Sequence, residues 1–377
     1  MSTTRWKLYT GNEEIWEAML AACEKATKSI DLEQFIFVDD AVGKRFIDVC
    51  TQKAADGVRV RFLWDAAGSF SFFGSTLADD LKKKGIKLIF FKTLVPGFFN
   101  VHNYRSWYFR NHRRSLVIDG EVGFTGSICM WQKTANWRDM QVEVEGHVVA
   151  EMADAFQRMW DRASGKKLLR QEKKNRRKLN KKKREYIKKY SSRDTTEFIY
   201  ETNSPIPKKR FMYYRLIEVI RAAEKSVYIT TPYFVPTRKL SRIIRLAAHR
   251  GVDVRIIIPK ASDKLIVDIA AQSFFQDMLD AGVKIYRYTG GTMLHSKATV
   301  VDGKWASVGS LNIDTVSLLY NFEANITSVN THFVENITTY FFEDLAQSEE
   351  VDRLTWQRRP FILKTPEIVV KLFRKFL

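Results

Sequence analysis

Two histidines in this chain of 377 residues each have a cation two positions further along, Arg114 after His112 and Lys297 after His295. Side chains at alternate positions of a strand point to the same face, so each histidine and its cation would project together. An imidazole can act as nucleophile or general acid near neutral pH, and a cation can neutralise charge that develops on a phosphate. Two such pairs are the groups that phosphoryl transfer through a covalent histidine requires.

The polar residues that follow each histidine repeat with the same spacing, which in the second copy is His-x-Lys-x4-Asp-x6-Gly-Ser-x-Asn. The further shared positions are the aspartates Asp119 and Asp302, the glycines Gly126 and Gly309, and the serines Ser127 and Ser310. We expect the serines and Asn312 to donate to a bound phosphate, and Glu323 to orient the imidazole of its own copy, with Asp139 as its counterpart in the first copy. The two aspartates each precede a glycine, which predicts hairpin turns and a structural role for both.

The elements around the motifs are also duplicated. In each half a helix ends at a glycine, Gly57 or Gly251, and a strand rich in β-branched residues follows. A further helix ends at Gly85 or Gly282, and after a third strand the histidine segment arrives as strand, turn and strand. This order predicts an α/β fold of two related halves, each a mixed β-sheet flanked by helices. We expect the halves to pack about a pseudo-two-fold axis that brings the two histidines together.

The repeat and the distribution of charge predict four segments. These are a first half at 1–165, a basic linker at 166–204, a second half at 205–346 and a basic amphipathic tail at 347–377. The net charge of +19 is concentrated in the linker. Such a block is either a solvated connection or an anchor on anionic lipid or nucleic acid.

Cysteine usage and hydropathy indicate where the chain works. Three scattered cysteines without metal-type spacing favour a reducing compartment over a disulfide framework. The first residues lack the apolar run of a signal peptide, and no run of apolar residues is long enough for a transmembrane helix. We therefore expect a cytoplasmic protein whose membrane contact is peripheral, on the inner face.

The duplicated pattern resembles the signature of the phospholipase D superfamily, and several flanking segments are similar to its cardiolipin synthase branch. These segments are 111–114, 117–120 and 124–126, then 137–139 with 144–146, and 231–236. The resemblance covers residues 10–165 and 205–377 and leaves out the basic linker. A single His-x-Lys pattern would be weak evidence for this family, whereas its near repetition in both halves is specific evidence.

The resemblance implies that one histidine attacks phosphorus to form a phosphatidyl-histidine, while the other protonates the leaving alcohol and then deprotonates the acceptor. It implies no metal, nucleotide or other cofactor. By resemblance His112 is the nucleophile and His295 the general acid and base, an assignment that the residues alone leave open. The first copy departs from the family at two positions, with Arg114 in place of lysine and Cys129 in place of asparagine. We interpret this as an active but asymmetric site, the alternative being a weakened or repurposed enzyme.

Three functions follow from the resemblance. The first is a phosphatidyltransferase that makes cardiolipin, with phosphatidylglycerol or a similar alcohol as acceptor. The second is a hydrolase, either a phospholipase D or a nuclease, and the third is a membrane- or nucleic-acid-binding protein without turnover. The aromatic segments 70–73, 94–99 and 107–109 and an amphipathic helix after Pro366 favour anionic phospholipid and a membrane surface over nucleic acid as partner. No obligate protein partner is predicted.

Overall fold

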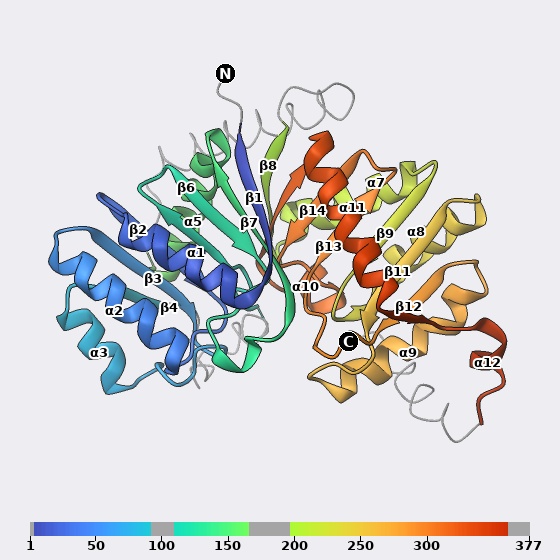
Figure 1. Ribbon diagram of the computed structural model, residues 1–377, viewed down its shortest axis with the longest axis horizontal. Coiled ribbons are helices and arrows are strands. Elements are labelled where there is room, and N and C mark those ends of the chain that lie inside the picture. Colours follow the sequence, from blue (N-terminus) through green and yellow to red (C-terminus); the bar gives the residue numbers. More distant parts are fainter. Residues whose placement is uncertain (1–3, 92–108, 166–196, 361–377) are drawn as a thin grey trace.

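Two β-sheets lie side by side in the computed structural model, which describes residues 4–91, 109–165 and 197–360 (Figure 1). The first sheet has the order β1-β7-β6-β5-β2-β3-β4. Its strands are β1 (Arg5–Gly11), β2 (Ser29–Gln34), β3 (Arg59–Asp65), β4 (Lys87–Phe91), β5 (Ser115–Ile118), β6 (Val122–Gly126) and β7 (Arg138–Glu145). Strands β2, β3 and β4 are parallel, whereas β5 runs antiparallel to β2. The sheet is therefore mixed, as predicted.

The second sheet repeats this plan with the order β17-β12-β11-β9-β13-β14-β16-β8. Its strands are β8 (Phe198–Asn203), β9 (Ser226–Thr230), β11 (Asp253–Pro259), β12 (Lys284–Tyr288), β13 (Ala298–Val301), β14 (Trp305–Gly309), β16 (Glu323–Ser328) and β17 (Ser348–Glu350). Two short strands, β10 (Phe234–Val235) and β15 (Ile313–Asp314), pair separately in parallel. Strand β13 runs antiparallel to β9, as β5 does to β2, so both histidine segments enter their sheets in the same way.

Helices flank both sheets. In the first half they are α1 (Asn12–Glu24), α2 (Ala41–Ala55), α3 (Thr76–Lys83) and α5 (His147–Ala163), with the 3-10 turn η2 (Gln132–Thr134). In the second half they are α7 (Phe211–Ala222), α8 (Arg238–His249), α9 (Leu265–Leu279), α10 (Thr315–Leu319), α11 (Thr331–Ala346) and α12 (Arg353–Gln357), with η3 (Pro207–Lys209). Gly57 and Gly251 follow α2 and α8 with φ of +88° and +90°, a left-handed conformation that glycine adopts without steric cost. The predicted helix ends are confirmed there.

One apolar core joins the halves. Val142 and Val144 of β7 belong to the same buried cluster as Val300 of β13 and Val308 of β14. Helices α5 and α11 also contribute side chains to this cluster. Figure 1 shows β7 and β14 facing each other at the junction, with α10 close to it. The halves thus form one body and place their histidine segments along a shared boundary.

Two of the predicted segment limits differ from the structure. Strand β8 (Phe198–Asn203) was expected in the linker but pairs along its whole length with β16 of the second sheet. Its last residue, Asn203, also donates through Nδ2 to the carbonyl of Leu318, 3.0 Å away. Strand β17 and helix α12 were expected in the tail, yet β17 pairs with β12, and Trp356 packs on Phe275. Hydrogen bonds and apolar contacts with the second sheet therefore extend that half on both sides.

Several sequence predictions fall on residues outside the described ranges: the basic stretch 166–196, the aromatic segments 94–99 and 107–108, and the helix after Pro366. Of the aromatic loop 70–73, Phe72 is buried in the core and Phe70 is exposed. Within the described ranges, no helix is both long and apolar enough to cross a membrane.

Candidate active site

Each catalytic histidine candidate is held by the backbone of the opposite half. The amide of His112, just before β5, donates to the carbonyl of Phe322, 2.9 Å away. The amide of His295, just before β13, donates to the carbonyl of Arg138 at 2.8 Å. Short bridges at Asn111 with Phe322 and at Arg138 with Leu294 complete these contacts. The two histidine segments are therefore cross-linked into one buried site.

The carboxylates that contact the imidazoles also cross between the halves. His112 Nδ1 lies 3.0 Å from Glu323 Oε2, and His295 Nδ1 lies 2.8 Å from Asp139 Oδ2. This differs from the prediction from the sequence, in which Glu323 orients His295 of its own copy. The pairing is reversed because the residue just before each carboxylate accepts from the histidine amide of the other half: Phe322 before Glu323, and Arg138 before Asp139.

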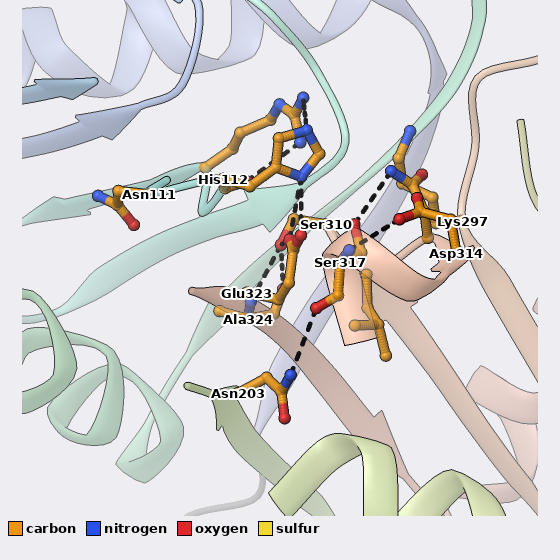
Figure 2. Close-up of polar contacts among 12 residues, drawn as sticks. Asn111, His112, Asn203, Lys297, Ser310, Asp314, Ser317, Glu323 and Ala324 are labelled. Carbon is orange, nitrogen blue, oxygen red and sulfur yellow. Dashed lines mark hydrogen bonds and ion pairs between the residues drawn. The ribbon is translucent and has the colours of Figure 1, made fainter. Parts of the chain in front are cut away.

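The motif serines hold these carboxylates. Ser310 Oγ donates to Glu323 Oε2 at 2.5 Å, and Ser127 Oγ donates to Asp139 Oδ1. Figure 2 shows Glu323 between His112 and Ser310. Both serines are fully buried, so their contacts in this structure are with the protein rather than with solvent. Donation by these serines to a phosphate stays a prediction.

Asn312 has one buried polar atom without a hydrogen-bond partner, as Arg114 and Glu323 also do. Its Nδ2 donates to Ser317 Oγ at 3.3 Å, while its Oδ1 is buried without a hydrogen-bond partner. The corresponding position of the first half is Cys129, which is also buried. The amide thus lies at the site with an unused acceptor, whereas the first half offers only a thiol.

The two motif cations occupy equivalent positions. Lys297 Nζ donates to the carbonyl of His295, and Arg114 Nη1 donates to the carbonyl of His112 at 3.2 Å. The arginine has a second arm, whose Nη2 lies 3.1 Å from His112 Nε2 and 3.7 Å from Cys129 Sγ. A guanidinium has only donors, so His112 Nε2 accepts with its lone pair and Nδ1 carries the proton. This tautomer donates to Glu323 and leaves Nε2 unprotonated, as a nucleophile requires.

The motif aspartates lie at the hairpin turns, with φ of 55° at both Asp119 and Asp302. The carboxylate of Asp119 accepts from the amides of residues 27–29, and that of Asp302 from the amides of residues 224–226. Each turn is thereby tied to the start of β2 or β9. These contacts lie at the far end of β5 and β13 from the histidines, so they fix the strands that carry the site.

The motif glycines lie where strands approach too closely for a side chain. A Cβ on Gly309 would lie 2.3 Å from the carbonyl oxygen of Ala324, and one on Gly126 would lie 2.2 Å from that of Met140. These carbonyls belong to the residues that follow the orienting carboxylates in the chain. The close approach therefore sets how near β14 and β6 lie to the strands that carry Glu323 and Asp139.

Known proteins match this chain in both of its halves. The family described as "Cardiolipin synthase, PLD-like domain" matches residues 19–160 and 216–345. The cardiolipin synthase of Geobacillus sp. (strain WCH70) is 34% identical over 99% of this chain and 72% of the relative. The chain belongs to this phospholipase D-like family. The probable cardiolipin synthase YwiE of Bacillus subtilis (strain 168) is 31% identical over 97% of this chain and 71% of its own length.

Solved structures support the same fold. The phosphatidylserine synthase of Haemophilus influenzae Rd KW20 superposes with a TM-score of 0.70, covering 98% of this chain and 92% of that one at 13% identity. A polyphosphate kinase from Porphyromonas gingivalis gives 0.63 over 100% of this chain and 54% of its own, at 12% identity. At such identities the likeness concerns the fold, which this phospholipase D-like chain shares over almost its whole length.

The electrostatics of this phospholipase D-like site differ between its two histidine–carboxylate pairs. Burial, together with the charges of Arg114 and Lys297, holds the pKa of His112 well below its usual range. Burial raises the pKa of its partner Glu323 to about 7, against the hydrogen bonds that this carboxylate accepts. In the other pair, burial opposes ionisation of Asp139, yet the charge and hydrogen bond of His295 keep the pKa of Asp139 far below the usual value.

The pKa values of Lys297 and His295 are also shifted. Burial and the charge of Lys297 lower the pKa of His295 to about 4, although Asp139 acts in the opposite direction. Burial lowers the pKa of Lys297 to about 7, so near neutral pH this lysine is only partly charged. Both shifts reflect several cations gathered in a site that excludes water. A bound anion would neutralise them and raise both pKa values.

Several residues beside the site had no predicted role. The rings of Phe35 and Trp137 lie 4.7 and 5.0 Å from those of His112 and His295. Tyr233 OH donates to Asp263 Oδ1 at 2.5 Å. These aromatic residues carry no chemical signal in the sequence beyond their place in the duplicated segments. In the described part of the chain, no group of three or more His, Cys, Asp or Glu side chains is arranged to hold a metal ion.

Proposed function

We propose that this chain is a phosphatidyltransferase of the cardiolipin synthase type, which moves a phosphatidyl group through a covalent phosphohistidine to an alcohol such as phosphatidylglycerol. The observation that carries this proposal is the crossed pairing of His112 with Glu323 and of His295 with Asp139. It gives one buried site two imidazoles, each with its Nδ1 on a carboxylate. His112 Nε2 accepts from Arg114 Nη2, and this hydrogen bond has to open before the nitrogen attacks phosphorus. The names of the relatives supply the substrate class.

In the first step the lone pair of His112 Nε2 attacks the phosphorus of the donor phospholipid. A nitrogen–phosphorus bond forms, the bond from phosphorus to the leaving alcohol breaks, and His295 Nε2 gives that alcohol its proton. Lys297 and Arg114 neutralise the charge that gathers on the phosphoryl oxygens. If phosphatidylglycerol is the donor, the leaving alcohol is glycerol.

In the second step His295 Nε2, now neutral, removes the proton from the hydroxyl of the acceptor. The acceptor oxygen attacks phosphorus, the nitrogen–phosphorus bond breaks, and His112 regains its lone pair. With phosphatidylglycerol as acceptor the product is cardiolipin. Atoms and charges balance without a cofactor, since overall one phosphate ester bond breaks, another forms, and one proton passes from the acceptor to the leaving alcohol through His295.

The difference between the carboxylates supports these roles. Burial lowers the pKa of His295 to about 4, but the ionised Asp139 at 2.8 Å opposes this shift, and the charge of a bound phosphodiester would raise the pKa further toward the imidazolium form that a general acid needs. His112, whose pKa is strongly lowered and whose Nε2 faces Arg114, stays neutral, as a nucleophile must. We therefore assign His112 as nucleophile and His295 as acid and base from the geometry and charge of their surroundings. The resemblance gave the same assignment.

The phosphate contacts are part of the same proposal. Arg114 and Lys297 would bind the phosphoryl oxygens, with Asn312 as the neutral donor of the second half. Asp119, Asp302 and the motif glycines fix the strands. We further propose that the chain acts at the inner face of the cytoplasmic membrane, where phospholipid substrates are within reach.

The test is incubation of the purified protein with labelled phosphatidylglycerol, with and without phosphatidylethanolamine, followed by lipid analysis. We expect cardiolipin and glycerol as products, and no product from His295→Ala or His112→Ala. Asp31→Asn, a buried carboxylate bound to Arg61 away from the histidines, is a matched control and should keep activity. Phosphatidic acid as the main product would reassign the chain as a hydrolase. Nucleic-acid cleavage without lipid turnover would refute the proposal.

A further inference from the structure

Three large apolar side chains stand out from the rest of the described surface. Leu265 and Ile266, the first residues of α9, are 75% and 70% exposed, and Phe70 is 67% exposed. No other large apolar side chain in the described ranges is as exposed as these. Single exposed apolar residues are common on protein surfaces, but these three occupy equivalent places in the two halves.

Phe70 lies in the loop after β3, and Leu265 and Ile266 follow β11. Strand β3 is the parallel neighbour of β2, and β11 is the parallel neighbour of β9. The carboxyl ends of β2 and β9 pair with the starts of β5 and β13, where the histidine segments enter. Both apolar groups are therefore carried by loops at the edge of the sheets where the active site lies.

The first apolar group is firmly anchored beside the nucleophile. Ser69 Oγ donates to the carbonyl of Phe35 at 3.2 Å and accepts from the amide of Phe37 at 3.0 Å. The ring of Phe35 in turn lies 4.7 Å from that of His112. Phe70, next to this anchor, thus projects from a fixed backbone rather than from a loose loop.

The second group is anchored on the other side. Asp263 accepts from the hydroxyl of Tyr233 at 2.5 Å, and Lys264 Nζ lies 5.0 Å from the centre of the Tyr233 ring. Tyr233 is buried and leads into β10, which pairs with β15 directly after Asn312. Lys264 is exposed and immediately precedes Leu265. A cation next to two exposed aliphatic residues is suited to an anionic, partly apolar surface.

We propose that Phe70, Leu265 and Ile266, together with Lys264, insert into the surface of an anionic phospholipid bilayer and place the mouth of the active site at the level of the lipid headgroups. This inference rests on the proposed function, because it takes the substrate to be a membrane phospholipid. A bilayer fits better than a protein partner. The loops that carry the two groups contact residues beside both histidine motifs, so a protein bound across both loops would obstruct access of a phospholipid to the histidines, whereas a bilayer supplies that phospholipid.

The test compares Leu265→Glu/Ile266→Glu and Phe70→Glu with wild type for sedimentation with vesicles of phosphatidylcholine, with and without phosphatidylglycerol. Leu354→Glu is the matched control, since Leu354 is 56% exposed on α12, away from the site loops. We expect the double variant to bind phosphatidylglycerol vesicles on the order of 100-fold more weakly, from the loss of two buried aliphatic side chains and the added charge. The control should bind as wild type does.

A second readout separates docking from chemistry. Turnover of a water-soluble p-nitrophenyl phosphodiester should be the same in all variants, because none of these residues contacts the histidines. Wild-type binding of vesicles without phospholipid turnover would sink the proposed function and leave docking standing. If the double variant still turned over phospholipid and bound vesicles as wild type does, the proposed insertion of these residues into the bilayer would be refuted. So would a shift in oligomeric state as its only effect, or binding that depends on residues 361–377 alone.

Insertion of the α9 start is tested independently of the charge that the glutamate variants add. The three natural cysteines are buried, so Leu265→Cys can be labelled selectively with an environment-sensitive fluorophore. We expect a blue shift and a rise in emission when phosphatidylglycerol vesicles are added. No change at this position, in a protein that binds the same vesicles, would refute insertion of the α9 start.

Discussion

Asp139→Asn should slow the reaction in a way that depends on the leaving group. The amide keeps the shape of Asp139 but removes the charge that faces His295 Nδ1 at 2.8 Å. His295 would then lie beside Lys297 with no counter-charge, and its pKa, already lowered to about 4, would fall further. Two unit charges about 4 Å apart at an effective dielectric constant of about 20 interact by about 4 kcal/mol, which corresponds to about 10³-fold in the protonated fraction.

The assay uses two donors with the same phosphatidyl or short-chain group, one losing glycerol and one losing p-nitrophenol. Glycerol needs a proton as it leaves, whereas p-nitrophenolate leaves without one. For Asp139→Asn we expect the rate of phosphohistidine formation in a single turnover to fall on the order of 10³-fold with the glycerol donor, within the usual contribution of general acid catalysis, and to change little with the p-nitrophenyl donor. Burst kinetics of p-nitrophenol release should persist, since attack by His112 is intact.

Glu323→Gln should give a different pattern, because in the proposed mechanism Glu323 orients the nucleophile His112. Both donors should then react more slowly by similar factors, and formation of labelled phosphohistidine should fall. Asp31→Asn again serves as the buried-carboxylate control. If Asp139→Asn slowed both donors equally, or if the better leaving group rescued Glu323→Gln instead, the assignment of acid and nucleophile would be wrong.

Three further predictions concern the rest of the site. Because Lys297 loses its proton as pH rises through about 7, kcat/KM should begin to fall at that pH. Lys297→Arg should move this fall at least one pH unit higher, and an unchanged pH profile would contradict the prediction. Arg114→Lys and Cys129→Asn should each lower kcat/KM by about tenfold, whereas the variant that carries both substitutions should recover most of that loss in a double-mutant cycle. Additive losses would show that the two positions act independently. Gly309→Ala should lower the free energy of unfolding by about 1–3 kcal/mol in a denaturant titration, because the added Cβ would collide with the backbone of the neighbouring strand. The control Gly11→Ala adds a Cβ in open space and should not lower it, so equal stabilities would show that β14 can shift freely.

The fold follows from signals that act locally. The glycines after α2 and α8 and the Asp-Gly turns after β5 and β13 specify their own backbone conformations, so their places were predictable residue by residue. The edge strands were not. Residues 198–203 carry aromatic and β-branched side chains that favour a strand. What the sequence does not show is that this strand pairs with β16, a partner distant in the sequence, and so belongs to the second half.

The crossed carboxylates could not be predicted either. The spacing of His295 and Glu323 places both in one half, and a single copy of the motif is consistent with a pair inside that half. Which histidine each carboxylate meets depends on how the two sheets pack, and that is set by apolar contacts such as those among β7, β13 and β14. The sequence shows which residue types form the site, but which histidine pairs with which carboxylate depends on how the two sheets pack against each other.

The two departures of the first motif act on the same volume. Arg114 repeats the contact of Lys297 with its histidine carbonyl through Nη1, and its Nη2 extends toward Cys129. In the second half the corresponding space holds the amide of Asn312. A thiol is smaller than an amide, so it leaves room for the guanidinium, which supplies the donor that the amide would have given. The exchange is then one coupled substitution rather than two separate losses, which argues for an active site over a weakened one.

The crossing also explains why both motifs must stay in one body. His112 has its orienting carboxylate, and the backbone acceptor for its amide, in the second half. His295 depends on the first half in the same two ways. Neither half alone contains a complete imidazole–carboxylate pair, so separation of the sheets would disable nucleophile and acid together. A substitution in the apolar core between the halves should therefore reduce activity before it unfolds either sheet, since a small shift of the interface changes both pairs at once.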